Sequence, residues 1–285
     1  MEILRDPGAM RAAVQRLRGG GHTLAFVPTM GNLHAGHLAL VAAARRHAEV
    51  VVASIFVNPL QFNDPADYAA YPRTFEEDVA ALGEAGVAAV FAPAPGSIYA
   101  RAPGRNTRVI VPGLSDTLCG LFRPGHFAGV ATVVCKLFNI VRPDVAVFGE
   151  KDYQQLLLIQ RLVEDLDLAV DIVPVPTVRE RDGLAMSSRN RYLDEAERRR
   201  APVLYRSLCE AAAALEAGRK DYAALEAAGM AAVAAGGLRP EYFSIRRAGD
   251  LALPHPGDRE LIVLAAAWLG SARLIDNVRA AWRKE

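Results

Sequence analysis

Cysteine is scarce in this chain of 285 residues, which contains only Cys119, Cys135 and Cys209. An odd number without CxxC spacing indicates neither a disulfide framework nor a cysteine-rich metal site, and is typical of a reducing compartment. The amino-terminal residues lack an apolar stretch followed by a cleavage site, and no apolar run approaches the roughly 20 residues that span a bilayer. We therefore expect a cytoplasmic protein with no membrane partner.

An excess of charge is also missing, because 33 Lys and Arg face 32 Asp and Glu, a net charge of +1. This balance predicts no general affinity for nucleic acid or anionic membrane, so any anion-binding site must be local. No GxxxxGK[ST] stretch occurs, which excludes a P-loop as the means of holding a triphosphate.

Hydrophobic residues are abundant, at 52% against 23% charged residues, and they provide for a packed core. The length predicts either one large α/β domain or a large domain with a smaller one attached, and we favour two units. Short β-rich runs alternate with helical patterns up to about residue 177, as in a parallel sheet with crossover helices. The predicted strands are 23–28, 49–57, 88–93, 107–111, 144–149 and 170–177. The predicted helices are about 35–48, 74–86, 126–141 and 152–166.

The composition changes near residue 180 to Ala- and Glu-rich helices, followed by two segments, 241–247 and 260–270, that are typical of antiparallel strands. We predict an α/β protein with a Rossmann-like parallel-sheet domain at 1–178 and a smaller α+β domain at 179–285.

The segment "PTMGNLHAGH" places a glycine-bearing turn between a predicted strand and a helix that begins near His34 and His37. Backbone N–H groups and the helix dipole at such a point can bind phosphate, and histidines three residues apart lie on one side of the helix. Three other interpretations stay open: a helix-capping histidine, a metal-binding HxxH pair and a simple turn. A zinc site needs a third and usually a fourth ligand, and the other histidines form no evident set with this pair.

Further polar segments follow other predicted strands, so they are expected at one edge of one sheet. Lys151 and Arg189 can neutralise phosphate oxygens, and Ser187 and Ser188 can donate to a leaving pyrophosphate. Asp152 can accept from a ribose or adenine donor. Each segment also has a structural interpretation, since an acid often follows the start of a helix and a serine often caps one.

Five segments together resemble the pantothenate synthetase family: "PTMGNLHAGH", "SIFVNPLQF", "YPRT", "LFRPGHFAGVATVVCKLFNIVRPDVAVFGEKDYQQ" and "AMSSRN". They occur in the family's order over residues 24–192, and the HIGH-type nucleotidyltransferase motif reads His34-Ala35-Gly36-His37. The resemblance implies a Rossmann-like fold and a ligase that joins pantoate to β-alanine. ATP, with Mg²⁺, would activate pantoate as an adenylate and leave as AMP and pyrophosphate.

The resemblance also implies residue roles. ATP would be held by residues of the first turn, the strand end near 149 and the segment near 187: Pro28, Thr29, Met30, Gly31, His37, Gly149, Lys151, Asp152, Met186, Ser187, Ser188 and Arg189. The catalytic set would be His34, His37, Lys151, Ser187, Ser188 and Arg189. In the substrate-binding set, Gln61 and Gln155 would hydrogen-bond pantoate, and Gln61 would also position β-alanine. Asn58 and Tyr71 would shape the phosphate and amine side of the pocket, and Arg123 would face the β-alanine carboxylate or the pocket rim.

No protein ligand for Mg²⁺ is assigned, although Asp78 and Glu77 are candidates. Two positions depart from the family pattern, where Ala35 stands for a common Glu and Leu60 for a usual Thr. The resemblance further implies a homodimer and a second domain that covers the nucleotide.

Two other functions remain open. A related nucleotidyltransferase would transfer a nucleotide to a phosphate acceptor without forming an amide, but Gln61 and Gln155 suit a neutral hydroxy acid better. A non-catalytic nucleotide sensor would bind ATP and release no pyrophosphate.

Overall fold

The computed structural model describes residues 1–101 and 105–281, and it divides into two compact units. Residues 102–104 lie outside the described residues, as do residues 282–285, which end the second predicted domain. The first unit comprises Met1–Glu150 and Gln155–Pro176, and the second comprises Lys151–Gln154 and Thr177–Glu285.

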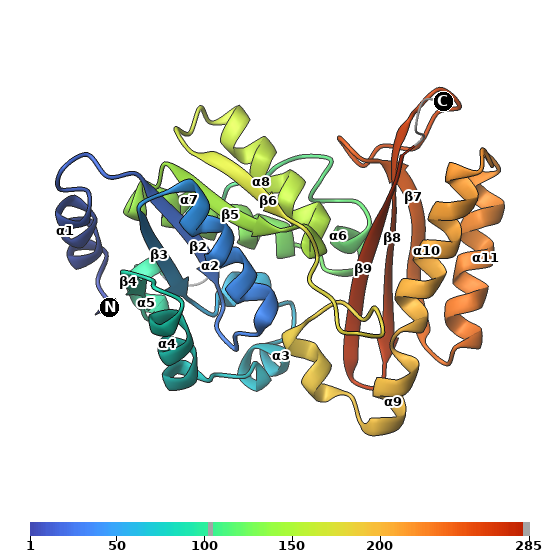
Figure 1. The fold of residues 1–285 in the computed structure, drawn as a ribbon, viewed down its shortest axis with the longest axis horizontal. Coiled ribbons are helices and arrows are strands. Elements are labelled where there is room, and N and C mark those ends of the chain that lie inside the picture. The colour runs from blue at the N-terminus through green and yellow to red at the C-terminus, as the bar shows by residue number, and fades with distance from the viewer. Residues whose placement is uncertain (102–104, 282–285) are drawn as a thin grey trace. The chain divides into compact units, whose positions relative to one another are not determined.

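The first unit is built on a six-stranded, wholly parallel sheet in the order β1-β4-β3-β2-β5-β6 (Figure 1). Its strands are β1 (Glu2–Leu4), β2 (Leu24–Thr29), β3 (Val50–Ile55), β4 (Ala89–Phe91), β5 (Val145–Gly149) and β6 (Asp171–Val175). This parallel order confirms the predicted Rossmann-like sheet. Its strands are almost entirely apolar because helices cover both faces of the sheet.

Helices cover both faces of this sheet. Its long helices are α1 (Pro7–Leu17), α2 (Ala35–His47), α4 (Phe75–Glu84), α7 (His126–Val141) and α8 (Tyr153–Asp165). Val41 of α2 and Leu82 of α4 join alternate strand residues such as Val27 in one buried cluster. Phe138 of α7 meets Phe148 of β5 edge to face, with ring centroids 6.4 Å apart, on the opposite face.

Short helical segments complete the first unit: η1 (Pro59–Gln61), α3 (Pro65–Ala70), α5 (Pro95–Ile98), α6 (Cys119–Phe122) and η2 (Glu150–Asp152), which ends in the second unit. The four predicted helices of this region are confirmed within two residues at each end. Helix α1 and strand β1 were not predicted, although Asp6 accepts from the backbone N–H groups of Gly8 and Ala9 and Pro7 follows it, as at many helix starts.

The strand predicted at 107–111 is wrong. This segment carries no strand, and the backbone N–H of Val109 donates to the Thr132 hydroxyl of α7 at 2.9 Å. Ile110 is 59% exposed. A segment rich in β-branched residues becomes a strand only when a neighbouring strand supplies hydrogen bonds, and this segment has no such neighbour, because β1 and β6 form the two edges of the sheet.

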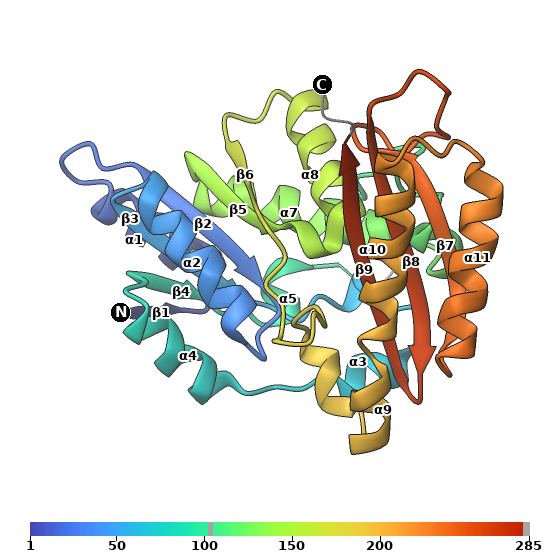
Figure 2. The same ribbon diagram turned by 45° about the vertical axis from the view of Figure 1, so that its right-hand side comes forward.

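The second unit contains a three-stranded antiparallel sheet, β7-β8-β9, with strands β7 (Arg239–Arg247), β8 (Glu260–Leu269) and β9 (Ala272–Ala281). Its helical elements are η3 (Ser188–Tyr192), α9 (Glu195–Arg200), α10 (Val203–Glu216) and α11 (Tyr222–Ala235). Figure 2 shows α10 and α11 along one face of the sheet, with β7, β8 and β9 side by side. The predicted α+β fold of this part is therefore confirmed. Its sheet has a third strand, β9, beyond the two that were predicted.

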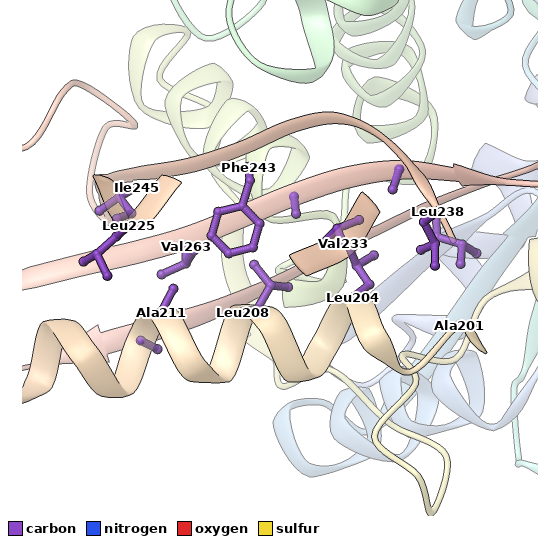
Figure 3. Close-up of a cluster of buried hydrophobic side chains, with 14 of the residues drawn as sticks. Ala201, Leu204, Leu208, Ala211, Leu225, Val233, Leu238, Phe243, Ile245 and Val263 are labelled. Carbon is purple, nitrogen blue, oxygen red and sulfur yellow. The ribbon is translucent and has the colours of Figure 1, made fainter. Parts of the chain in front are cut away.

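The core of the second unit lies between these two layers. Leu208 of α10 and Val233 of α11 are buried together with Phe243 of β7 and Val263 of β8, and Figure 3 shows Leu208 directed toward Phe243. Gly229 of α11 is required here, because a Cβ at that position would lie 2.4 Å from the Phe243 ring. Within residues 1–101 and 105–281, the helices lack the combination of length and hydrophobicity that a bilayer-spanning segment requires.

Candidate functional site

The carboxyl ends of three adjacent strands gather most of the predicted site residues of the first unit. Strand β2 pairs with β3 on one side and with β5 on the other, all in parallel. Because the chain runs from β2 to β3 but returns to the other side at β5, the switch point of the sheet lies between β2 and β5. The segments that follow these strands therefore begin at one edge, where α/β proteins bind ligands.

The turn after β2 is held tightly. The Thr29 hydroxyl donates to the Ser54 carbonyl at 2.7 Å and accepts from the backbone N–H of Gly31 at 3.1 Å. Gly31 has φ +78°, and a Cβ there would lie 2.8 Å from Oδ2 of Asp78. Glycine is therefore the residue that this left-handed turn accepts.

Asp78 of α4 is buried, at 3% exposure, directly beneath this turn. Its carboxylate accepts the backbone N–H groups of Asn32 and Leu33, both at 2.8 Å, and the Thr74 hydroxyl at 3.2 Å. The candidate metal ligand of the sequence analysis thus has both oxygens engaged in anchoring the turn. Among the described residues, no group of three or more His, Cys, Asp or Glu is placed to hold a metal ion.

His34 and His37 form a reciprocal cap at the start of α2. Nδ1 of His34 accepts from the backbone N–H of Gly36 at 3.1 Å, and Nδ1 of His37 accepts from that of His34 at 3.3 Å. The rings are tilted by 44°, with centroids 4.1 Å apart. Since an accepting Nδ1 carries no proton, each neutral ring carries its proton on Nε2. The capping interpretation is therefore correct, and the reciprocal cap fixes the orientation of both rings.

Asn58 and Gln61 lie just beyond β3 and are both buried. Asn58 caps η1 through its Oδ1, which accepts from the backbone N–H of Leu60 at 3.3 Å, and its Nδ2 donates to Oε1 of Gln61 at 2.9 Å. The main-chain carbonyl of Gln61 accepts from Nη2 of Arg123 at 3.1 Å and from Nδ1 of His126 at 2.8 Å. Arg123 therefore holds the Gln61 backbone, a contact that sequence reasoning did not anticipate.

The other first-unit predictions fall close to these segments in the chain. Pro28 lies within β2 and Gly149 ends β5, while Gln155 is half-buried in the first turn of α8. Tyr71 is buried and meets Phe62 edge to face at 5.7 Å.

A cavity of about 210 Å³ opens beyond the ends of β2, β3 and β4. Met30, Gly31, Phe56, Arg73 and Asp78 are among its lining residues. Two predicted ATP-binding residues therefore border an open space at the carboxyl edge of the sheet.

The remaining predicted residues belong to the second unit. Nζ of Lys151 lies 3.7 Å from Oδ2 of Asp152, and the Lys151 carbonyl accepts from Nδ2 of Asn277 in β9 at 3.0 Å. Ser187 caps η3 by accepting from the backbone N–H of Arg189 at 3.2 Å. Ser188 begins η3.

Arg179 attaches the segment around Ser187 to β9. It pairs in an isolated bridge with Ala185, and the backbone N–H of Met186 donates to the Val178 carbonyl at 2.9 Å. The Arg179 guanidinium donates to both oxygens of Asp276 at 2.6 and 3.0 Å. Lys151 and the segment of Ser187 are thus both tied to adjacent residues of one strand.

Burial raises the pKa of the Asp276 carboxyl, and the hydrogen bonds from Arg179 act in the opposite direction. Sequence reasoning missed this pair. The available signal was an acid at position 276 directly after two apolar residues in "ARLIDNV", because such an acid must be paired when buried.

Comparison with known proteins places these motifs in a family context. The sequence pattern of the family described as Pantoate-beta-alanine ligase matches residues 2–279. The chain is 60% identical to the pantothenate synthetase of Thioalkalivibrio sulfidiphilus, over 98% of this chain and 97% of that protein. It is 54% identical to that of Nitrosococcus oceani, over 98% of each.

Solved structures agree with the sequence relatives. The crystal structure of pantothenate synthetase from Thermus thermophilus aligns with a TM-score of 0.90 at 47% identity, covering 98% of this chain and 99% of that chain. The pantoate-beta-alanine ligase of Francisella tularensis, complexed with beta-gamma ATP and beta-alanine, aligns with a TM-score of 0.82 at 33% identity, covering 98% of this chain and 97% of that one.

Proposed function

Since the chain belongs to the pantoate–beta-alanine ligase family and is therefore a ligase of pantoate and β-alanine, we propose that it uses ATP and passes through a pantoyl adenylate. The pantoate carboxylate attacks the α-phosphorus of ATP, and pyrophosphate leaves. The β-alanine amine then attacks the acyl carbon, loses a proton and displaces AMP. The Francisella relative, solved with an ATP compound and β-alanine together, supports this pair of ligands.

The observation that carries the proposal is the capped pair of histidines at the switch point of the sheet. Because the backbone occupies both Nδ1 atoms, we propose that the Nε2–H groups of His34 and His37 donate to the phosphates. We propose that Met30 and Gly31 border the nucleotide and that Gln61 holds pantoate. A phosphate-binding role of this kind needs donors fixed before the ligand arrives, which the reciprocal cap provides.

We propose further that residues of the second unit act on the same nucleotide. Lys151 and Arg189 would balance phosphate charge, while Ser187 and Ser188 would donate to the departing pyrophosphate. We propose contacts to ATP and substrates for the other predicted residues as well: Pro28, Thr29, Gly149, Asp152, Met186, Tyr71, Arg123 and Gln155. Asn58 is buried and bonded to Gln61 and to the Gly129 carbonyl, so we propose that it shapes the pocket through Gln61. The anhydride reacts with water, so we expect the second unit to cover the nucleotide during reaction.

We propose that Mg²⁺ binds together with ATP. The buried Asp78 is engaged by backbone N–H groups, and the described residues offer no ligand cluster of three or more. Phosphate oxygens and water supply the oxygen ligands that Mg²⁺ prefers.

We also propose that the protein is a homodimer, and sedimentation equilibrium at micromolar concentration tests this directly.

Pyrophosphate release tests the function. With ATP and pantoate alone, we expect a burst of about one pyrophosphate per active site, because the adenylate stays bound. Addition of β-alanine should convert the burst into steady turnover with equal amounts of AMP and pantothenate. A burst that is absent with pantoate but appears with a phosphorylated acceptor would replace this function with nucleotidyl transfer, and ATP binding without any pyrophosphate would indicate a sensor.

A further inference from the structure

Tyr99, which no sequence motif singled out, is connected to Gln61 through Asn58. The Tyr99 hydroxyl lies 2.8 Å from Oδ1 of Asn58, and Nδ2 of Asn58 lies 2.9 Å from Oε1 of Gln61. The same Nδ2 lies 3.0 Å from the main-chain carbonyl of Gly129 in α7. Tyr99, Asn58, Gln61 and the Gly129 carbonyl are called the amide relay below.

The Gly129 carbonyl determines the direction of every hydrogen bond in the amide relay. A carbonyl oxygen only accepts, so the Asn58 atom that faces it must be the NH2 group. The Asn58 oxygen then faces the backbone N–H of Leu60 at 3.3 Å and the Tyr99 hydroxyl, which therefore donates. Because the Asn58 NH2 donates to Gln61, the Gln61 oxygen must face inward, and its NH2 group must face away from Asn58.

A close approach of two segments makes this arrangement possible. A Cβ at Gly129 would lie 2.2 Å from the Leu60 carbonyl oxygen, so only glycine lets α7 come near enough to η1 to present its carbonyl to Asn58. Asn58 is 1% exposed, where an unsatisfied amide would be costly. The amide relay satisfies both of its polar atoms, so no flipped arrangement of equal energy exists.

The Tyr99 ring is held independently of its hydroxyl. It packs near Phe56 with ring centroids 6.3 Å apart, and Nζ of Lys136 lies 6.0 Å from the centroid of the Tyr99 ring. Burial raises the pKa of the Tyr99 hydroxyl, which keeps the group a donor at neutral and mildly alkaline pH.

We propose that Tyr99 is a positioning residue for the acid substrate, because the amide relay fixes Gln61 with its NH2 group outward as a donor for an oxygen of that acid. The inference rests on the proposed function, in which Gln61 contacts pantoate. Among the described residues, no hydrogen bond uses Nε2 of Gln61, so this donor is available to a ligand. Because the outward NH2 group donates, it favours a substrate that presents a carboxylate or hydroxyl oxygen at this point over one that presents only a hydrogen-bond donor.

Tyr99→Phe tests the positioning role, because it removes the hydroxyl and keeps the ring. We expect KM for pantoate to rise about three- to tenfold, the effect of one neutral hydrogen bond, while kcat and KM for ATP change less than about twofold. Tyr222→Phe is the matched control, since it removes a hydroxyl that contacts the His255 carbonyl at 3.4 Å in the second unit. An unchanged KM for pantoate, or an equal rise for ATP, would overturn the role of Tyr99.

Gln61→Glu tests whether the Gln61 side chain presents its NH2 group or its oxygen to the substrate. The glutamate can still accept from Asn58, but it presents an oxygen outward in place of the NH2 group. We expect KM for pantoate to rise at least about tenfold above that of Gln61→Ala, since two carboxylates repel. A KM at or below that of Gln61→Ala would show that Gln61 presents its oxygen, and the amide relay would be wrong.

A measurement without turnover separates this inference from the proposed function. In an NMR titration, the resonances of the Gln61 side-chain NH2 group are assigned by their loss in Gln61→Glu. Their chemical shifts should change when pantoate is added to the wild-type protein. In Tyr99→Phe they should move in the absence of ligand and require more pantoate to saturate. If the wild-type signals respond to pantoate but Tyr99→Phe behaves identically, only the relay fails. If wild-type protein neither binds pantoate nor releases pyrophosphate, the function fails, and this inference with it.

Discussion

The buried carboxylate of Asp78 accepts a 2.8 Å hydrogen bond from the backbone N–H of Leu33, the residue directly before His34. A side chain of α4 therefore fixes the turn from which the capped histidines project. Because the second oxygen binds the adjacent N–H of Asn32, the turn has two points of attachment to a helix that lies more than forty residues away in sequence.

Asp78→Asn should weaken both folding and activity. The new NH2 group faces one of the two backbone N–H groups, which loses its acceptor at a cost of about 1–3 kcal/mol. We expect kcat/KM to fall about ten- to a hundredfold through displacement of the turn. Unfolding in urea and steady-state kinetics measure the two effects.

Glu77→Gln provides the control for Asp78, since Glu77 is exposed on the same helix and was the other candidate for magnesium. It should behave as wild type. The magnesium concentration for half-maximal rate should be the same in both variants and in wild type. A large increase confined to Asp78→Asn would make Asp78 a metal ligand in place of an anchor.

Breaking the Arg179–Asp276 pair should destabilise the second unit. Asp276→Asn leaves the guanidinium facing a neutral group inside the protein, and loss of one partner of a buried pair costs about 3–5 kcal/mol. Arg179 also stacks on Tyr205, with the guanidinium carbon 3.7 Å from the ring centroid, so part of its packing is retained. Urea unfolding measures the loss.

The pair between Arg198 and Asp182 serves as the comparison. Its side chains are 35% and 42% exposed, so Asp182→Asn should change the free energy of unfolding by no more than about 1 kcal/mol. Equal losses for Asp182→Asn and Asp276→Asn would contradict the structural importance assigned to the buried pair.

Lys151→Ala should slow adenylation strongly if this ammonium balances phosphate charge. Removal of one such group from a reacting centre reduces kcat by about 10²–10³-fold. Single-turnover pyrophosphate release reports this step separately from amide formation. Lys220→Ala, which removes a surface lysine bound to the Pro256 carbonyl of the same unit, should leave the rate unchanged. A wild-type single-turnover rate in Lys151→Ala would remove this lysine from the mechanism.

The three cysteines should be dispensable, because the proposed route forms no covalent enzyme intermediate. Burial raises the pKa of the Cys135 thiol, which makes it a poor nucleophile at neutral pH. A variant with alanine at Cys119, Cys135 and Cys209 should retain kcat within about twofold and lose modest stability from the buried Cys119. Loss of turnover with an intact circular dichroism spectrum would require a thiol in the chemistry.

Local sequence signals predicted most of the first unit. The strands that became β2, β3 and β5 are apolar runs ended by turn residues, and such runs need two covered faces wherever they occur. The segment at 107–111 carries a similar pattern but pairs with no strand, because strand formation also depends on a neighbour that the pattern does not specify. Strand β9 was missed because its polar residues, including Asp276 and Asn277, interrupt the apolar alternation and find partners only in the folded protein.

The sequence by itself determined the fold class, the family and the residue types of the candidate site, since periodicity and ordered motifs are properties of the chain alone. Only the tertiary structure decided the anchoring of the turn by Asp78, the tie between Arg179 and Asp276 and the inward oxygen of Gln61. Each of these depends on a polar contact between residues far apart in sequence, which for the amide relay is the contact between Asn58 and the Gly129 carbonyl. Hydrogen bonds require positions within a few tenths of an ångström, and those positions are set by packing between elements, which no local pattern encodes.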